Sequence, residues 1–145
     1  MRAVVQRVAG ARVLVDGETV GEVGSGLCIL LGVAADDDEA TAERLAGKVA
    51  RLRIFENEEG KFDRSLVDVH GGALVVSQFT LIADTARGNR PSFTGAAPPE
   101  RAERLYDGFC EALESQGIDV GKGRFGARMV VELANDGPVT IVLDV

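Results

Sequence analysis

Apolar residues in the first part of the chain follow the pattern of short β-strands. Runs rich in β-branched residues cover 3–8 and 11–16, and Asp16-Gly17 marks a turn after the second run. A further short strand is expected over 20–23. The run 27–33 is apolar throughout, which predicts a central strand that is buried on both faces.

Two later segments have the spacing of amphipathic helices. The first follows the acidic run 36–38, which suits the positive end of a helix. The second begins at Pro98-Pro99 and ends before Gly117. The apolar positions are Leu45, Val49 and Leu52 in the first helix, and Ala102, Leu105, Phe109 and Leu113 in the second.

A second strong apolar strand is expected over 73–81, after the turn signal Gly71-Gly72. Two segments are interpreted as loops, 56–61 and the long, Arg-containing stretch 85–99. The chain then closes with three strand-like segments. They are 118–120, 128–133 and 139–145. This order predicts a single α+β domain over residues 1–145, in which helices pack against an antiparallel or mixed sheet.

Composition limits the class of protein. The chain has 145 residues, of which 46% are hydrophobic and 27% charged, as in soluble globular domains. Its longest apolar stretch, 27–35, is much shorter than the ~20 residues that span a bilayer. The first residues lack the apolar run of a signal peptide. A cytoplasmic protein with no membrane partner is therefore expected.

The net charge and the reactive side chains exclude further classes of protein and of catalytic site. The net charge of −7 argues against a general nucleic-acid coat protein, so any RNA contact requires basic residues gathered on one face. Cys28 and Cys110 are interpreted as buried thiols, because neither has a ligand neighbour at metal spacing. His70 is the only histidine, so a zinc site or a two-histidine relay cannot be built.

The segment Ser77-Gln78-Phe79-Thr80-Leu81 is the first candidate for chemistry. A strand that changes abruptly from apolar to Ser-Gln exposes backbone N–H groups that can stabilise an oxyanion. The plainer alternative is a half-buried strand whose hydroxyls face solvent. A nucleophilic Ser77 or Thr80 needs a base, and His70 is not expected beside Thr80 because a strand rises ~3.3 Å per residue. The Gly-x-Ser-x-Gly elbow of serine hydrolases is absent.

Two further segments are candidates for binding. The run Asn135-Asp136-Gly137-Pro138-Val139-Thr140 has the composition of a turn before the last strand. The segments 87–93 and 122–128 combine basic and aromatic residues, which suits phosphate contact and base stacking. Their alternative is a solvated loop with phenylalanines that anchor in the core.

Taken together, these motifs resemble the D-aminoacyl-tRNA deacylase family over essentially the whole chain. Two motifs carry most of the resemblance, the strand motif 77–81 and the Gly-Pro segment 135–140. The others are Gln6-Arg7-Val8, Arg87-Gly88, Arg90-Pro91-Ser92-Phe93, and Gly123-Arg124-Phe125 followed by Met129. A related deacylase of animal cells edits an L-amino acid and lacks the Ser-Gln-Phe motif, so the match favours the D-specific branch.

The resemblance implies a homodimer of three-layer β/α/β subunits with active sites at the dimer interface. It implies that Gly137-Pro138 has a cis peptide bond and reaches into the partner's pocket. There its carbonyl oxygens would meet the substrate's amino group. L-amino acids would be rejected by that backbone, whereas D-amino acids and glycine would fit.

The resemblance also implies the roles of the remaining residues. Ser77, Gln78, Phe79 and Thr80 would form the catalytic floor, with an oxyanion hole from the N–H groups of Phe79 and Thr80. The 2′-hydroxyl of the terminal adenosine would assist, with no cofactor and no metal. Phe125 and Met129 would line the adenosine pocket, and Arg7 would orient the Gly-Pro segment. The partners would be D-aminoacyl-tRNA or glycyl-tRNA and a second subunit, with no DNA. Two alternatives stay open: a small-molecule esterase with Thr80 as nucleophile, and an RNA-binding module without turnover.

Overall fold

The N-terminal third forms three strands, and the third of them is as buried as its sequence predicts. The structure is a computed structural model that describes residues 1–145. The strands are β1 (Arg2–Val15), β2 (Glu18–Val23) and β3 (Gly26–Gly32). Segments 3–8 and 11–16 were expected as separate strands, but they are one continuous β1. The reason is that β8 pairs with β1 from one end to the other.

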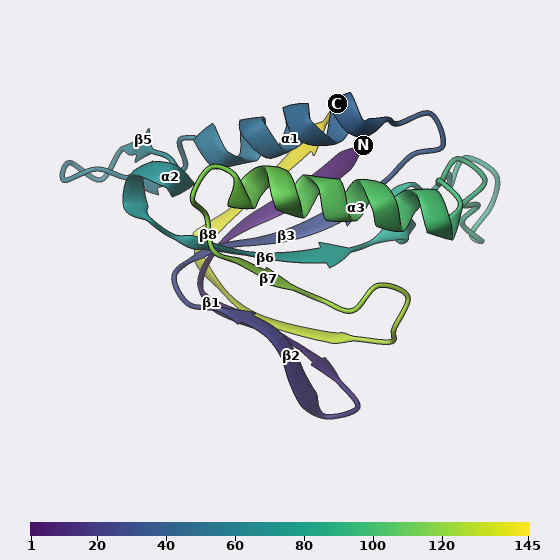
Figure 1. Cartoon of the computed structure of the whole chain (residues 1–145), viewed down its shortest axis with the longest axis horizontal. Helices are drawn as coiled ribbons and strands as arrows, with labels where there is room; N and C mark the ends of the chain where they lie inside the picture. Colours follow the sequence, from purple (N-terminus) through teal and green to yellow (C-terminus); the bar gives the residue numbers. More distant parts are fainter.

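Helices α1 (Glu39–Arg51) and α3 (Pro99–Glu114) form where the apolar spacing predicts them. At the start of α1, the Asp38 side chain accepts a hydrogen bond of 2.9 Å from the Thr41 N–H, so the acidic run does cap the helix. Both helices cover the same face of the sheet (Figure 1). No helix of the chain combines the length and the apolar character that a membrane crossing requires.

Three small elements between α1 and the next long strand were not expected. They are β4 (Phe55–Glu56), β5 (Phe62–Arg64) and α2 (Leu66–Val69). Ser65 and Asp68 form a reciprocal capping box around α2. Elements of two to four residues are too short for a period in the sequence to reveal them.

The expected strand 73–81 is wrong in its second half. Strand β6 (Gly72–Ser77) ends at Ser77, and a 3₁₀ turn, η1 (Phe79–Leu81), replaces its continuation. Ser77 is the last residue that pairs with β3, opposite Leu31. Because β3 itself ends at Gly32, the chain beyond Ser77 has no strand to pair with and turns back on itself.

The interpretation of 135–138 as a turn between two strands is also wrong. After β7 (Val120–Lys122), the chain forms one strand, β8 (Val130–Asp144), that runs through this segment. The pairing with β1 is irregular there. Thr140 lies opposite Gln6 and Asn135 opposite Val8, so residues 136–139 bulge out opposite Arg7 alone.

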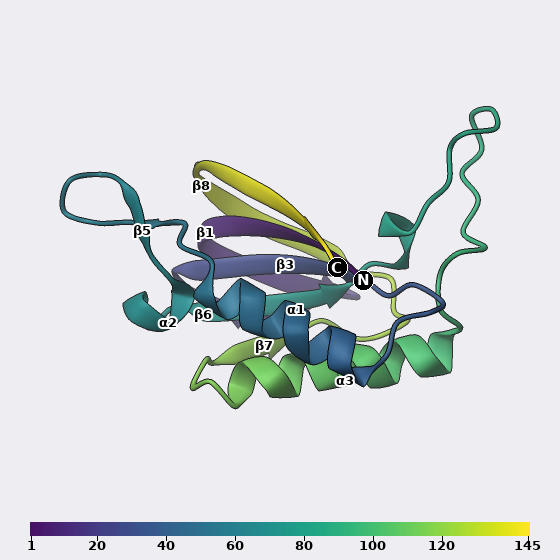
Figure 2. The same ribbon diagram turned by 90° about the horizontal axis from the view of Figure 1, so that it is seen from above.

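The main sheet has the order β2-β1-β3-β6-β7, with β8 paired to β1. Its pairs β3–β6 and β6–β7 are parallel and the others antiparallel. The α+β class and the mixed sheet are therefore confirmed. Since β1 and β8 are long and bent, β2 comes to lie beside β7, and the sheet curls into a near-barrel (Figures 1 and 2).

Two apolar clusters fill the space on the two sides of the central strands. The larger has 27 buried residues and joins the helices to the sheet through side chains such as Leu45, Phe109 and Ile29. The smaller lies inside the curl, with Cys28 and Val13 among its members. The layers of one chain are thus helices, central strands and the folded-over parts of β1, β2 and β8. The helices lie outermost because their other faces are polar.

Candidate active site

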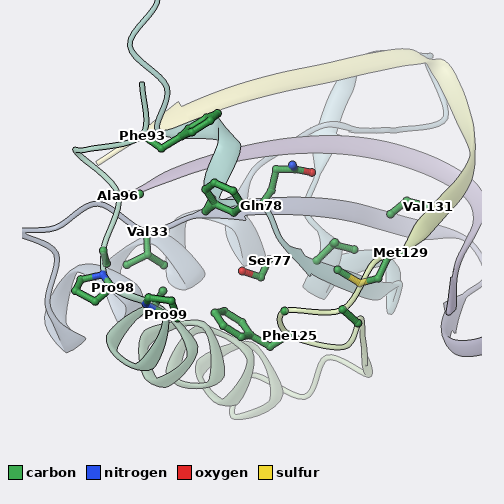
Figure 3. A pocket seen from close by; sticks show the side chains of 16 residues that line it. Val33, Ser77, Gln78, Phe93, Ala96, Pro98, Pro99, Phe125, Met129 and Val131 are labelled. Atoms are coloured by element: carbon green, nitrogen blue, oxygen red, sulfur yellow. The ribbon is translucent and has the colours of Figure 1, made fainter. Parts of the chain in front are cut away.

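A cavity of about 670 Å³ opens where β6 ends. Its lining is mostly hydrophobic, with 11 of 16 residues apolar, which suits a flat apolar group better than a highly charged one. Ser77 lies in the middle of the cavity, between Met129 and Val33 (Figure 3). The lining residues are Val33, Val76, Ser77, Gln78, Phe79, Phe93, Ala96, Ala97, Pro98, Pro99, Ala102, Phe125, Gly126, Ala127, Met129 and Val131.

The structure thus brings together five residues that the sequence singled out. Ser77, Gln78 and Phe79 come from the end of β6 and the start of η1, and Phe125 and Met129 come from the segment between β7 and β8. These two parts of the chain meet because β7 pairs with β6 in parallel, which places their carboxyl ends side by side. Thr80 is exposed and does not line the cavity.

The η1 turn leaves two backbone N–H groups without a partner, one on Phe79, which lines the cavity, and one on the next residue, Thr80. Its own hydrogen bonds run from the Leu81 N–H to the Gln78 carbonyl, 3.1 Å, and from the Ile82 N–H to the Phe79 carbonyl, 2.9 Å. The N–H groups of Phe79 and Thr80 precede these donors and take no part in the turn. They are therefore free to donate to a ligand.

Two contacts fix the position of η1. Arg2 donates from Nη1 to the Leu81 carbonyl over 3.0 Å, and its Nη2 pairs with Asp144 at 2.7 Å. On the other side, a Cβ on Gly32 would lie 2.9 Å from the Leu81 Cβ, so only glycine allows the turn to approach β3 this closely. The sequence did not single out Arg2, because a lone arginine at a strand end carries no signal of its own.

The aromatic wall of the cavity is held by contacts below it. The Phe125 ring lies 6.1 Å from the Tyr106 ring of α3. Tyr106 donates a hydrogen bond of 2.7 Å to the Val75 carbonyl. Burial raises the pKa of Tyr106 well above its ordinary value, so this hydroxyl stays protonated and the bond persists. The ring of Phe125 therefore packs against a side chain that is itself held in place.

Phe93 completes the opposite wall, although the sequence placed it only in a basic loop. Its ring meets the Phe79 ring edge-on, with centroids 5.1 Å apart and planes inclined by 73°. This contact anchors the long loop 83–96, which otherwise extends away from the body of the molecule (Figure 2). The sequence signal that could have assigned Phe93 to the cavity was an aromatic residue inside a loop otherwise rich in Arg, Gly and Pro.

Four arginines stand on the two segments that supply the aromatic wall residues Phe93 and Phe125. Arg87 and Arg90 stand on the loop that ends at Phe93, and Arg124 and Arg128 flank the wall residue Phe125. All four are exposed, and none forms an ion pair within the chain. The four arginines are therefore exposed and without an ion-pair partner in the two segments that contribute Phe93 and Phe125 to the cavity, even though the net charge is −7.

The Gly137–Pro138 peptide bond is cis, and Gly137 has a φ of +130°. Arg7 is buried beside this segment and donates from Nε to the Asp136 carbonyl, 3.1 Å, and from Nη1 to the Ile54 carbonyl, 2.9 Å. The Asn135 amide donates to the carbonyls of Arg7 and Val139. Arg7 and Asn135 thus hold both sides of the bulge in β8.

Within one chain, the Gly137-Pro138 segment and the cavity lie apart. Ser77 is in register with Leu31, which pairs with Ala3, whereas Gly137 bulges opposite Arg7. The offset is roughly 13 Å along β1 and about three strand spacings across the sheet, on the order of 20 Å in total. The structure therefore does not bring these two candidate groups together in a single subunit.

His70 cannot act on Thr80. It caps α2 in a left-handed conformation, just before β6, whereas Thr80 lies beyond the far end of that strand. The prediction that these two residues lie apart is confirmed. Across the chain, no group of three or more His, Cys, Asp and Glu side chains is arranged to hold a metal ion.

Relatives with known sequences resemble the chain over its full length. The family model described as D-Tyr-tRNA(Tyr) deacylase matches residues 4–144. A protein named D-aminoacyl-tRNA deacylase from Deinococcus deserti is 59% identical over 145 residues, which cover 100% of this chain and 99% of that protein. The protein of the same name from Roseiflexus castenholzii is 61% identical over 144 residues, 99% of this chain and 92% of its own length.

Solved structures show the same fold. The c-Myc DNA Unwinding Element Binding Protein superposes with a TM-score of 0.93 at 43% identity and covers 100% of this chain and 99% of its own. A probable eukaryotic D-amino acid tRNA deacylase gives a TM-score of 0.86 over 99% and 98%, and at 19% identity it supports the fold alone. Together with the sequence relatives, these matches show that the chain belongs to the D-aminoacyl-tRNA deacylase family and is a hydrolase with the activity for which that family is named.

Proposed function

We propose that the cavity binds the terminal adenosine of D-aminoacyl-tRNA and that its ester bond is hydrolysed above Ser77, Gln78 and Phe79. One observation carries this proposal: the strand-end motif and the apolar wall of Phe125 and Met129 line the same cavity. An adenine ring is flat and largely apolar, and it stacks well on aromatic side chains. The exposed arginines on the segments that carry Phe93 and Phe125 supply phosphate contacts for the rest of the RNA.

In this proposal, the free N–H groups of Phe79 and Thr80 form the oxyanion hole. When water attacks the ester carbonyl, negative charge develops on the carbonyl oxygen, and two fixed donors stabilise it more in the transition state than in the ground state. The carbon–oxygen bond to the 3′-oxygen then breaks. The water oxygen stays in the carboxyl group of the free amino acid, and a proton from the water passes to the 3′-oxygen of the released tRNA.

The Thr80 hydroxyl acts as a positioning group in this scheme and not as the nucleophile. Gln78 Nε2 donates a hydrogen bond to the Thr80 Oγ1, which withdraws electron density from that oxygen. No base stands beside it, since His70 lies at the other end of β6. The 2′-hydroxyl of the terminal adenosine is the remaining group that can assist proton transfer.

Chirality is proposed to depend on a second subunit. The Gly137-Pro138 segment is exposed but lies far from the cavity of its own chain, so it can serve only the cavity of a partner. In a homodimer its carbonyl oxygens would meet the amino group of the substrate, and the side chain of an L-amino acid would collide with the same backbone. Glycine has no side chain to collide, so glycyl-tRNA is also a substrate in this scheme. The subunit acts as a single domain in the cytoplasm, where charged tRNA is found.

The function is tested by the release of D-tyrosine, L-tyrosine and glycine from matched tRNAs in the presence of a chelator. Release of D-tyrosine and glycine but not L-tyrosine is expected. Release of both enantiomers would overturn the role of Gly137-Pro138, and tRNA binding without release would favour an RNA-binding module. In Thr80→Ala, a partial loss of rate is expected. Complete loss with normal tRNA binding would favour the covalent esterase mechanism.

The shared site is tested by mixing two variants, each of which is expected to lose most of its activity at substrate concentrations well below KM. Phe125→Ala damages the cavity and Pro138→Ala damages the segment that enters the partner's cavity. In a mixed dimer one site carries both defects and the other carries neither, so random reassociation restores about a quarter of the wild-type activity. Mixing would restore nothing if each site were built within one chain.

A further inference from the structure

Asp37 is a buried carboxylate that the deacylation chemistry does not use. Its side chain is only 8% exposed and lies 2.8 Å from the amino group of Met1. The same amino group donates to the Val145 carbonyl, and the Met1 carbonyl accepts from the Val145 N–H. A buried charge is costly unless it is paired, and Asp37 is paired at the point where β1 begins.

The second interaction of this carboxylate leads to the cavity. Asp37 Oδ2 accepts a hydrogen bond of 2.6 Å from the Ala34 N–H, which closes a tight turn over 34–37. This turn is bonded to the cavity wall on both sides of Ala34. The Ala35 N–H donates to the Gly95 carbonyl, 2.9 Å, and the Ala97 N–H donates to the Val33 carbonyl, 3.0 Å. Val33, Ala96 and Ala97 line the cavity itself.

The backbone of Asp37 provides a third connection, to helix α3. Arg101 donates from Nη2 to the Asp37 carbonyl, while its Nε is buried without a hydrogen-bond partner. Arg101 belongs to the first turn of α3, next to Pro98, Pro99 and Ala102 of the cavity wall. Three parts of the chain that are distant in sequence therefore meet at one residue.

We propose that Asp37 is a positioning residue that holds the 93–99 wall of the cavity in the conformation that binds the terminal nucleoside of the substrate. Residues 93–98 of this wall precede α3 and form no helix or strand, so their few hydrogen bonds to the 33–35 segment decide their position. A charged carboxylate between a buried ammonium and a backbone N–H fixes that segment more firmly than a neutral group can. The inference rests on the proposed use of the cavity by the substrate.

The test compares Asp37→Asn with two neighbouring substitutions. Asp36→Asn makes the same charge change at an exposed position. Asp38→Ala removes the α1 cap and lowers stability without touching the wall. Amide hydrogen exchange at Ala97 measures how often the hydrogen bond from this wall residue to Val33 opens. Steady-state kinetics on D-tyrosyl-tRNA measures substrate binding and turnover at the cavity. In Asp37→Asn, we expect Ala97 to exchange about tenfold faster. We also expect KM to rise about fivefold or more while kcat stays within about twofold.

Neither control is expected to change exchange at Ala97 or KM. Unchanged exchange at Ala97 in folded Asp37→Asn would overturn the inference, and so would a loss of kcat with unaltered KM. If Asp37→Asn does not fold, Arg101→Met removes the link to α3 instead and is expected to raise KM in the same way. Phe125→Ala separates the positioning role of Asp37 from the hypothesis that the substrate binds in the cavity. If it raises KM and Asp37→Asn does not, the positioning role fails, whereas unchanged KM in both would show that the cavity is not the substrate site.

Discussion

Replacing Arg7 with methionine tests whether the Gly137-Pro138 segment is held in place by one buried cation. Methionine keeps most of the aliphatic volume and removes the guanidinium. Arg7 is only 7% exposed, so the groups that the guanidinium contacts lose a buried partner. The ion pairs to Glu56, 3.4 Å, and to Asp136, 3.5 Å, involve half-exposed carboxylates, so together they contribute less than about 1 kcal/mol. The hydrogen bond to the Ile54 carbonyl matters more, because Ile54 is buried and its carbonyl loses its partner.

An unsatisfied buried carbonyl costs about 1–3 kcal/mol, and the lost bond to the Asp136 carbonyl adds about 1 kcal/mol. We therefore expect Arg7→Met to lower the free energy of unfolding by about 2–4 kcal/mol, measured by urea denaturation. Because the Asp136 carbonyl directly precedes Gly137, we also expect the ratio of D-tyrosine to L-tyrosine release to fall. Arg12→Met is the matched control. It removes an exposed pair with Glu132 on the same two strands, and it is expected to cost less than about 1 kcal/mol and to leave the ratio unchanged.

Two results would refute this reasoning. A stability loss as small as that of the Arg12 control would show that the bonds from the Arg7 guanidinium to the two carbonyls contribute little. Retention of the full D-over-L ratio in a destabilised Arg7→Met would show that Arg7 supports the fold without orienting the Gly-Pro segment.

Three further results are expected. Phe93→Ala should raise KM for D-tyrosyl-tRNA about tenfold with kcat near wild type, because the proposed nucleoside cavity loses one of its aromatic wall residues. Gly137→Ala should lower stability by about 1–3 kcal/mol in urea unfolding, since its Cβ would lie 2.7 Å from a neighbouring side chain. Gly88→Ala, with nothing within 4 Å, should cost about 1 kcal/mol from its positive φ alone. Burial raises the pKa of Cys28 to about 11 and of Cys110 to about 12, so both thiols should resist alkylation in the native state. Because unfolded thiols ionise near pH 8.5, stability should be full below about pH 8.5 and should fall as the pH rises toward 11. Urea unfolding of the wild type and of a variant with both thiols replaced by alanine would measure that slope.

The sequence was sufficient to predict those elements whose structure depends only on residues close together in the chain. The apolar run over β3 predicted a strand buried on both faces, and the spacing of Leu45 and Val49 predicted α1. Strand and helix periods are local properties, so they can be read from the sequence alone. The motif 77–79 was singled out because its change from apolar residues to Ser-Gln is a local feature, whereas Phe125 and Met129 were assigned to the site only through the family resemblance.

Where a strand ends or bulges was decided by its pairing with strands that are distant in the sequence. The strand expected over 73–81 stops at Ser77 because β3, its partner, ends at Gly32. That early end creates the η1 turn, and with it the free N–H groups of Phe79 and Thr80. The composition of 135–138 indicated a turn, but long-range pairing with β1 keeps the segment inside β8 as a bulge held by Arg7.

The sequence by itself therefore determined the family, the fold class and the residue types of the site. The tertiary structure decided which of those residues share a cavity. It placed Ser77 with Phe125 and left Gly137 on the order of 20 Å away. It also gave Asp37 a role that an acidic run before a helix does not suggest, because its partners are residues 1, 34 and 101. The physical reason is that backbone pairing and burial act between segments that the order of residues leaves far apart.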